Sequence, residues 1–221
     1  MTQIRRIAVL MTSFNRKAHT LRALESVKNQ RAMDDRCVEV FLVDDGGTDG
    51  TGDAVRIQFP EVYLLQGDGS LYWNGGMRKA FAAALSERFD GYLLLNDDTE
   101  LYADALARVV RCAEDQIAAG APAIVVGSTR SPQTGAHSYG GVTLYKNGAR
   151  VVMKKVAPHE SEPVTCDTMN GNIALVPRAI AAIVGNLDIG FRHQFGDLDY
   201  GLRARHAGFA VVIAPGYAGE C

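Results

Sequence analysis

The stretch VFLVDDGGTDGTGD, residues 40–53, joins an apolar run to a polar loop and decides the fold that we expect. The run ends at Asp44 and Asp45, and a loop of Gly, Thr and Asp residues follows at once. In open parallel sheets, ligands bind in the crevice beyond the carboxyl ends of the strands, so a carboxylate pair at such an end marks a candidate ligand site. The glycines suit tight turns, and Asp49 suits a cap for the next helix.

Strand and helix patterns alternate around this stretch. Short apolar runs that end in polar or Gly residues predict strands, and apolar residues spaced three and four apart predict helices packed on a sheet. This alternation indicates βαβ units and therefore an α/β fold, with a mostly parallel central sheet flanked by helices. The predicted strands lie within 6–14, 37–45, 61–67, 91–98 and 123–128, and the predicted helices within 18–30, 48–59, 76–89 and 102–120.

The second half of the chain has a different pattern. Asn147-Gly148 separates two alternating runs within 138–156, which predicts a β-hairpin. Segment 168–185 indicates a strand, a helix that starts after Pro177 and a Gly stop, and segment 195–216 indicates a helix followed by a strand. The sequence contains no internal repeat, low-complexity segment or linker. The second half is therefore expected to extend the sheet of a single domain.

Composition limits the classes of partner. The 221 residues carry a formal net charge of -2 and no long Lys/Arg run, which argues against binding of nucleic acid through its phosphates. The apolar N-terminal run is too short for a signal peptide, and no stretch approaches the roughly 18 apolar residues of a membrane span. We therefore expect a cytoplasmic protein with small-molecule partners, with contact at the inner face of the membrane left open. The scattered cysteines indicate neither zinc nor disulfides, and the oligomeric state is not indicated.

Two further carboxylates follow another predicted strand. Asp97 and Asp98 come after Leu95 and Asn96, and carboxylates confined together raise each other's pKa unless a cation or donors compensate. A hard cation such as Mg2+ or Mn2+ would compensate and would keep positions open for diphosphate oxygens. The alternative is structural, since Asp98 or the following Thr could cap a helix that begins near Leu101.

A third carboxylate pair lies at the start of the last predicted helix. Asp197 and Asp199 stand two residues apart, and one of them is a candidate general base facing the crevice. The structural alternative is that both favour the helix N-terminus and that Asp199 pairs with Arg203 four residues on. His193 lies close by in the sequence. It either contacts the acceptor or a metal, or has an ordinary structural role as a hydrogen-bonded side chain.

The segment GDGSLYWNGGMRKA, residues 67–80, is rich in glycine and holds the only tryptophan. Its glycines, Gly75 among them, permit close approach of backbone to a ligand, and Trp73 either stacks on a sugar or base or anchors the loop in the core. Arg78 either touches a diphosphate or lies on a helix surface.

A phosphatase of the haloacid dehalogenase type is a weaker match to the stretch that begins at Asp44, because Gly46 stands where its D-x-D-G-T pattern requires a second Asp.

Five segments, taken in order, resemble one known family. They are IAVLMTSFNR, VFLVDDGGTDGT, LLLNDDTEL, NGNIALVPRAI and FGDLDYGLRARHAG, and they are similar to the inverting nucleotide-sugar glycosyltransferases of family 2, which have the GT-A fold. The resemblance covers nearly the whole chain. It implies one GT-A, Rossmann-like catalytic domain over 1–221, with a nucleotide-sugar half at 1–128 and an acceptor and catalytic-base half at 129–221.

The resemblance also implies roles for individual residues. Asp98 would be the ligand of Mg2+ or Mn2+, Asp97 would lie near the ribose, and Asp197 would be the catalytic base. The nucleoside would be held by Thr12, Ser13, Asn15 and Asp45. We expect further substrate contacts from Trp73, Asn74, Gly75, Arg78, Asn170, His193 and Asp199.

The sequence departs from the family pattern at three places. Gly196 replaces the Glu that precedes the base, and Asn96 occupies the first position if the D-x-D element is counted from there. Many members continue beyond the position of Cys221 and supply there a metal-binding His or acceptor-binding helices. The resemblance therefore implies a domain truncated at its C-terminus or an unusually short member.

The expected reaction is single-displacement transfer of a sugar from a UDP- or dTDP-sugar to a hydroxyl of a glycan or lipid-linked glycan. The segment 67–80, in which an aromatic residue is followed by glycines, is similar to that of rhamnosyl and galactofuranosyl transferases of bacterial surface polysaccharides. This similarity favours a role in surface polysaccharide synthesis. Two alternatives stay open. One is a nucleotidyltransferase, although the loop after the first strand lacks the glycines that grip a triphosphate; the other is a binding module without catalysis.

Overall fold

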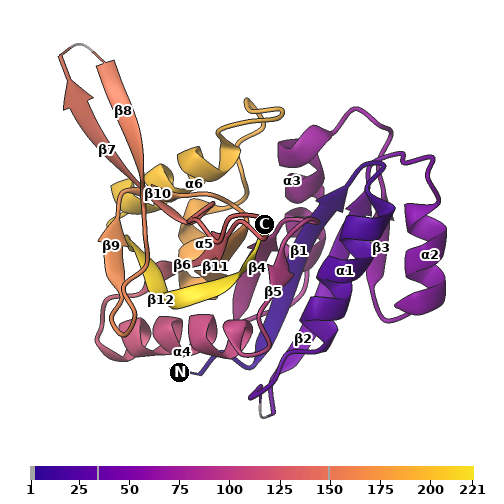
Figure 1. Cartoon of the computed structure of the whole chain (residues 1–221), viewed down its shortest axis with the longest axis horizontal. Coiled ribbons are helices and arrows are strands. Elements are labelled where there is room, and N and C mark those ends of the chain that lie inside the picture. Colours follow the sequence, from indigo (N-terminus) through magenta and orange to yellow (C-terminus); the bar gives the residue numbers. More distant parts are fainter. Residues whose placement is uncertain (1–2, 34, 149) are drawn as a thin grey trace.

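The structure is a computed structural model that describes residues 3–33, 35–148 and 150–221. It confirms the α/β fold, with a nine-stranded central sheet in the order β3-β2-β1-β4-β11-β6-β12-β5 and β9 beside β12 (Figure 1). Six of the strands run in one direction, and β5, β9 and β11 run in the other. The strands of this sheet are β1 (Arg6–Ser13), β2 (Cys37–Asp44), β3 (Tyr63–Gln66), β4 (Gly91–Leu95), β5 (Glu100–Leu101), β6 (Ala123–Arg130), β9 (Val164–Cys166), β11 (Ile173–Pro177) and β12 (Ala210–Glu220).

Helices cover both faces of the sheet, and a smaller sheet of β7, β8 and β10 stands beside it. In the first half, helices link parallel strands as the alternating pattern predicted. The helices are α1 (Lys17–Lys28), α2 (Thr51–Gln58), α3 (Tyr72–Leu85), α4 (Ala105–Ala118), α5 (Arg178–Val184) and α6 (Gly196–His206), and the small sheet holds β7 (Gly141–Asn147), β8 (Arg150–Val156) and β10 (Thr168–Met169).

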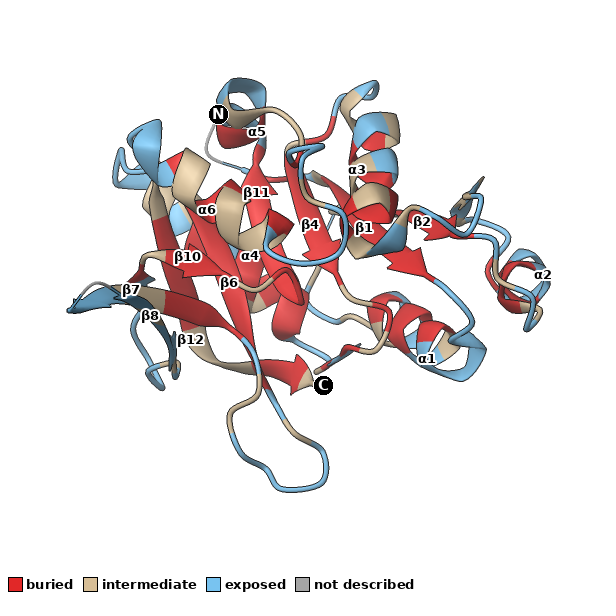
Figure 2. Ribbon diagram, turned by 90° about the horizontal axis from the view of Figure 1, so that it is seen from above, coloured by how far each residue is buried: buried red, intermediate tan, exposed pale blue. Residues whose placement is uncertain are grey.

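Alternation along the buried strands divides the core into two layers. Ile7, Val9 and Met11 of β1 pack in the layer with α1, α2 and α4, whereas Ala8 and Leu10 pack in the layer with α3, α5 and α6. Because a buried aliphatic side chain contributes roughly 1.5–3 kcal/mol, both layers hold the strands firmly. Figure 2 shows the strands buried and the outer faces of the helices exposed. The carboxyl ends of β1 and β2 are therefore fixed, with Ser13 level with Asp44.

Several sequence predictions of elements are confirmed. The hairpin forms from β7 and β8, with Asn147 paired to Arg150; position 149 of its turn lies outside the described residues. The 168–185 segment contains β11, α5 and Gly185 at the helix end, where φ is +75°. The last segment forms α6 and β12 as expected.

Two boundaries differ from prediction. Helix α3 begins at Tyr72 rather than near residue 76, so the Gly75-Gly76 pair lies inside a helix instead of a loop. The helix expected from about residue 102 begins at Ala105 after the short strand β5, so the alternative in which Asp98 or Thr99 caps it is wrong. Asp49 lies one residue before the Gly50 cap, and its carboxylate accepts hydrogen bonds from the Thr51 N–H (3.0 Å) and hydroxyl (2.6 Å).

No helix within the described part of the chain is both long enough and apolar enough to cross a membrane.

Candidate active site

Two adjoining cavities lie at the carboxyl edge of the sheet, where the polar strand ends meet. The smaller, of about 230 Å³, is lined by Thr12, Ser13, Asp45 and Asp97 among others. The larger, of about 590 Å³, is lined by Asp98, Asn170, Asn172 and Asp197 among others. Both cavities touch Arg16, Trp73 and His193. The fold thus brings the three carboxylate groups to one cleft, although the last of them is some 100 residues from the second in the chain.

Asp45 supports the wall of the smaller cavity. It is 3% exposed, and its carboxylate accepts hydrogen bonds from the backbone N–H groups of Gly69, Leu71 and Tyr72, each at 3.0 Å. Three such bonds fix the loop before α3 and its first turn against the end of β2. Asp44 supports the loop after β2, since its Oδ1 accepts the Gly47 N–H at 3.0 Å.

Asn15 connects two loops rather than lining either cavity. It has a φ of +54°, and its Oδ1 accepts the backbone N–H groups of Thr48 at 2.7 Å and Asp49 at 3.2 Å. Asn tolerates this left-handed conformation better than most residues. The loop after β1 is thereby tied to the loop after β2, which positions Thr12 and Ser13.

Asp97 and Asp98 share one guanidinium. Arg16 lies 3.5 Å from Asp97 Oδ1 and 2.6 Å from Asp98 Oδ2. Asp97 is 6% exposed, and its buried Oδ2 has no hydrogen-bond partner among the residues that the structure describes. Burial raises the pKa of Asp97 to about 6, and Arg16 opposes that shift. The charge pair is therefore only partly compensated by the protein.

This donor set fits a hard cation in part. Among the described residues, no three His, Cys, Asp or Glu side chains gather in one metal-binding group. Two carboxylates at one strand end, one with an unpartnered buried oxygen, nevertheless supply the oxygen ligands that Mg2+ and Mn2+ prefer. Mg2+ is commonly bound through one or two carboxylates together with substrate phosphates and water, and the pair matches that mode.

Asp197 faces the larger cavity from the first turn of α6. Its Oδ2 accepts the Gly171 N–H at 2.8 Å and its Oδ1 accepts the Leu198 N–H at 2.9 Å. Burial raises the pKa of Asp197, and these two N–H groups oppose the shift. No Lys or Arg of the described residues forms an ion pair with it. A carboxylate held by N–H groups but without a counter-ion is suited to accept a proton.

Trp73 stands at the junction of the two cavities. Its indole N–H donates to Asn96 Oδ1 at 2.7 Å, so the ring is anchored to the strand end that carries Asp97. A Cβ on Gly171 would lie 2.6 Å from the indole Cζ2, so the absence of a side chain there lets the ring approach the backbone beside Asp197. Trp73 is thus anchored by its hydrogen bond and also faces both cavities. The anchoring role and a contact with a sugar or base, which the sequence left as alternatives, are compatible with one another.

His193 and Asn170 complete the rim. The His193 ring lies 5.7 Å from the Tyr72 ring, centroid to centroid, and lines both cavities. Asn170 lines the larger cavity, and its buried Oδ1 has no hydrogen-bond partner in the described part of the chain. A buried acceptor of this kind is free to accept a hydrogen bond from a ligand hydroxyl.

A family model described as glycosyl transferase family 2 matches residues 8–173 of the chain. The chain belongs to that family. The match covers the segments that carry Thr12, Asp45, Asp98 and Asn170, and the resemblance read from the sequence is confirmed.

Solved structures agree on the fold. One match is the mannosyltransferase PcManGT from Pyrobaculum calidifontis in complex with GDP-Man and Mn2+, with a TM-score of 0.65 and 16% sequence identity. The likeness covers 99% of this chain and 57% of that chain, so the chain spans little more than half of its neighbour's length. Likeness at this identity supports the GT-A fold of the family 2 domain. No curated protein matches the chain.

Besides Asn15, four residues expected to contact substrate lie outside both cavities of this family 2 domain. Asn74 is buried and donates to the Asp188 and Phe191 carbonyls, and Arg78 Nε donates to the Leu187 carbonyl at 2.8 Å. These bonds hold the 186–195 segment on α3. Gly75 packs on Leu71, and Asp199 forms an ion pair with Arg203 at 2.7 Å.

Three residues of the cleft were not predicted from the sequence. Arg16 follows the polar end of the first strand, and that position was its only signal; its partner Asp98 is 82 residues away. Tyr139, in the segment before β7, and Lys155 of β8 line the larger cavity, and nothing in the local sequence marks them.

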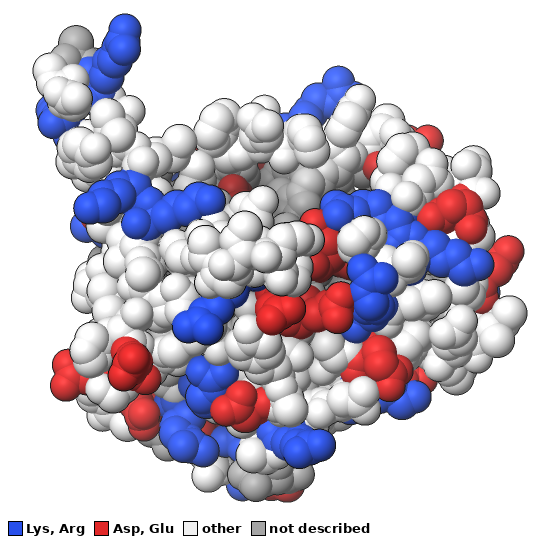
Figure 3. Space-filling model, in the orientation of Figure 1, with Lys and Arg blue, Asp and Glu red and all other residues white. Residues whose placement is uncertain are grey.

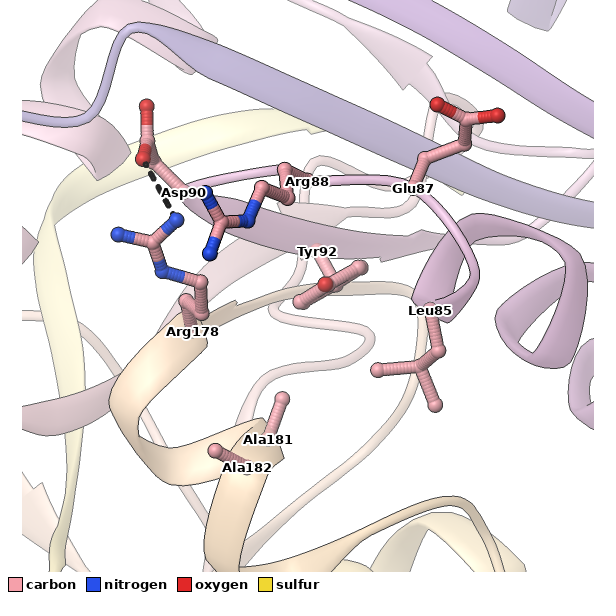
Figure 4. Close-up of a pocket in the computed structure, with 8 residues that line it drawn as sticks. All are labelled: Leu85, Glu87, Arg88, Asp90, Tyr92, Arg178, Ala181 and Ala182. Atoms are coloured by element: carbon pink, nitrogen blue, oxygen red, sulfur yellow. Dashed lines mark ion pairs between the residues drawn. The ribbon is translucent and has the colours of Figure 1, made fainter.

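Another cavity, of about 680 Å³, lies at the opposite edge of the sheet (Figure 4). Arg178 pairs there with Asp90 at 3.6 Å, while Glu87 points away. None of the candidate site residues lines it.

Proposed function

We propose that the domain is an inverting glycosyltransferase that moves a sugar from a UDP- or dTDP-sugar to a hydroxyl of a glycan or lipid-linked glycan. The observation that carries the proposal is the placement of Asp197, which forms no ion pair with another described residue, in one cleft with the Asp97–Asp98 pair: Asp98 lines the larger cavity together with Asp197, and Asp97 lines the adjoining one. A base and a site for an anionic leaving group within one cleft suit in-line displacement at a sugar carbon that is bound between them.

The donor's nucleoside is assigned to the smaller cavity. Thr12, Ser13 and Asp45 line it, and Asp97 would face the ribose. Arg16 would meet the diphosphate, because its guanidinium already lies at the acidic pair and phosphate is a good bidentate partner. A divalent cation held by Asp98, when bound, would neutralise charge on the departing nucleoside diphosphate. The neighbouring structure holds GDP-Man and Mn2+, which supports a donor and metal of this kind.

The acceptor is assigned to the larger cavity. Its attacking hydroxyl would hydrogen-bond to Asp197, with Asn170 and Asn172 as contacts for neighbouring hydroxyls. As the oxygen forms its bond to the anomeric carbon, its proton passes to the Asp197 carboxylate and the bond to the nucleoside diphosphate breaks. One displacement inverts the anomeric centre. A base whose pKa is raised toward neutrality is more effective in this step.

The sugar and pathway rest on likeness in the 67–80 segment. Its similarity to rhamnosyl and galactofuranosyl transferases supports a role in surface polysaccharide synthesis. The other assigned contacts of the donor and acceptor are Trp73 and His193, which touch both cavities.

Calorimetric titration with UDP- and dTDP-sugars, with and without Mn2+, tests the donor assignment. We expect binding that Mn2+ strengthens and that Asp98→Asn makes insensitive to Mn2+, because a carboxamide is a weaker ligand for a hard cation. Absence of binding to any nucleotide sugar would refute the proposal.

Product analysis separates the alternatives. A transferase releases a nucleoside diphosphate, whereas a nucleotidyltransferase given a nucleoside triphosphate and a sugar phosphate releases pyrophosphate. A binding module would bind the nucleotide sugar and release neither, also in the presence of acceptor glycans.

A further inference from the structure

The β7–β8 hairpin differs in charge from the rest of the chain. Residues 141–156 contain Lys146, Arg150, Lys154 and Lys155 and no Asp or Glu, whereas the whole chain has a formal net charge of -2. The hairpin alone thus carries +4. Figure 3 shows Lys and Arg side chains along this projecting part of the molecule.

The same hairpin exposes large apolar side chains. Val151 is 65% exposed, Met153 52% and Tyr145 49%. The two strands extend away from the body of the molecule (Figure 1), and their outer ends are coloured as exposed in Figure 2. An aliphatic surface that remains in water has an unfavourable hydration free energy, which a partner of matching chemistry would relieve.

The strand register interleaves the two kinds of side chain. Lys146 pairs with Val151, and Tyr145 pairs with Val152 on the other face, next to the pair of Asn147 and Arg150. Every apolar side chain at the outer end therefore has a cation beside it. One face continues into an apolar groove of about 340 Å³ formed with Phe195 and Leu202 of the α6 region.

Two acidic side chains beside the hairpin are already paired: Asp167, which accepts the Leu144 N–H, and Asp199, which lines the groove next to it. Asp167 forms an ion pair with Arg205, and Asp199 forms one with Arg203. Asp197 is held by backbone N–H groups. In the part of the chain that the structure describes, no ion pair neutralises the hairpin's four cations.

We propose that the β7–β8 hairpin docks the domain on the surface of an anionic lipid bilayer. The projecting end of the hairpin would enter the headgroup region with Val151 on one face and Tyr145 on the other, since aromatic and aliphatic side chains are favoured there. Lys146, Arg150 and Lys154 would meet lipid phosphates. A nucleic acid offers phosphates but no hydrocarbon for the exposed aliphatic side chains, so the bilayer is the better match.

Docking in this orientation brings the cleft to the membrane surface. Val142, Met153 and Lys155 of the hairpin line the larger cavity. The proposal does not depend on the proposed reaction, because the hairpin would bind lipid whether or not the cleft transfers a sugar.

Flotation with lipid vesicles tests the docking. The wild-type chain should float with vesicles of phosphatidylcholine containing about one-third phosphatidylglycerol, much less with phosphatidylcholine alone, and less as salt rises toward 1 M. Each basic residue near an anionic surface contributes about fivefold to the partition coefficient. The triple variant K146Q/R150Q/K154Q should therefore lose about a hundredfold.

A matched control makes the loss specific. The variant R31Q/R88Q/R111Q removes three exposed arginines from other elements and changes the net charge equally, and it should bind vesicles within about threefold of wild type. The variant Y145S/V151S should weaken binding while the cations remain, because the apolar contact is lost.

Three results would overturn the proposal. They are equal flotation with neutral and anionic vesicles, a control that loses as much binding as the hairpin triple, and binding of an oligonucleotide that is tighter than binding of vesicles. Thermal melting of each variant within a few degrees of wild type establishes that the substitutions leave the fold intact, which the exposure of all these side chains predicts.

Discussion

At the scale of single residues, Asp97 and Arg16 set the electrostatics of the cleft. Asp97 is buried at the end of β4 with one oxygen unpartnered, and the guanidinium of Arg16 is nearer to Asp98 than to Asp97. Burial therefore outweighs pairing in setting the pKa of Asp97. A buried carboxylate in this state destabilises the fold when ionised, as expected of a group retained for binding rather than for stability.

The metal-free protein should accordingly be stabilised by Asp97→Asn near neutral pH. The pKa of Asp97 rises from about 3.9 in the unfolded chain to about 6 in the folded protein. Asp97 therefore stays protonated to a higher pH in the folded state than in the unfolded state, and the free energy of unfolding falls as pH rises between these values. The substitution should add ~1–3 kcal/mol at about pH 7 and little at about pH 4.

Urea unfolding at the two pH values in the presence of a chelator measures this difference. The neighbouring Asp98→Asn serves as the control, since Asp98 is more exposed and bonded to Arg16. A stabilisation by Asp97→Asn that is equal at both pH values would contradict the assigned cause.

At the scale of elements, the close contact of α3 with β1 decides where Trp73 lies. A Cβ on Gly76 would lie 2.0 Å from the Thr12 hydroxyl oxygen, so this glycine lets the helix approach the strand end that lines the smaller cavity. Its neighbour Gly75 faces Leu71, and a Cβ on Gly75 would lie 3.2 Å from the Leu71 Cβ. Two adjacent glycines of one helix thus have different roles.

Gly76→Ala should destabilise the protein and Gly75→Ala should not. Overpacking typically costs ~1–3 kcal/mol, and this outweighs the ~1 kcal/mol that Ala gains over Gly in a helix. For Gly75→Ala the gain in helix propensity should offset the tighter Leu71 contact. Thermal unfolding of both variants checks the contrast, and equal melting temperatures would show that the helix–strand contact is looser than described.

The sequence predicted most elements but misplaced the start of this helix. The apolar runs of β1, β2 and β4 are long and β-branched or Leu-rich, so local pattern identified them. Gly75-Gly76 is a turn signal in isolation, and only the packing of Gly76 against Thr12, 64 residues away, explains the pair inside a helix. Tertiary contact overrode local propensity at this point.

At the scale of the whole molecule, the sheet brings distant polar segments to one edge. Strand-end chemistry predicted that Asp45, Asp97 and Asp98 would meet there, because parallel strands share their carboxyl edge. Long-range partners could not be predicted in the same way. Arg16 pairs with Asp98 across 82 residues, and Lys155 reaches the cleft from a hairpin whose orientation depends on packing against the rest of the fold.

We propose that Asp197 is the base of a sugar transfer within this cleft, and one measurement tests this role directly. Release of nucleoside diphosphate, measured with a donor that binds, should fall about 10²- to 10⁴-fold in Asp197→Asn while donor affinity stays near that of wild type. Asp167→Asn is the matched control, since Asp167 is also a carboxylate that contacts α6, through Arg205, but lies outside both cavities. Its turnover should match wild type. Turnover by Asp197→Asn at the wild-type rate would contradict the account.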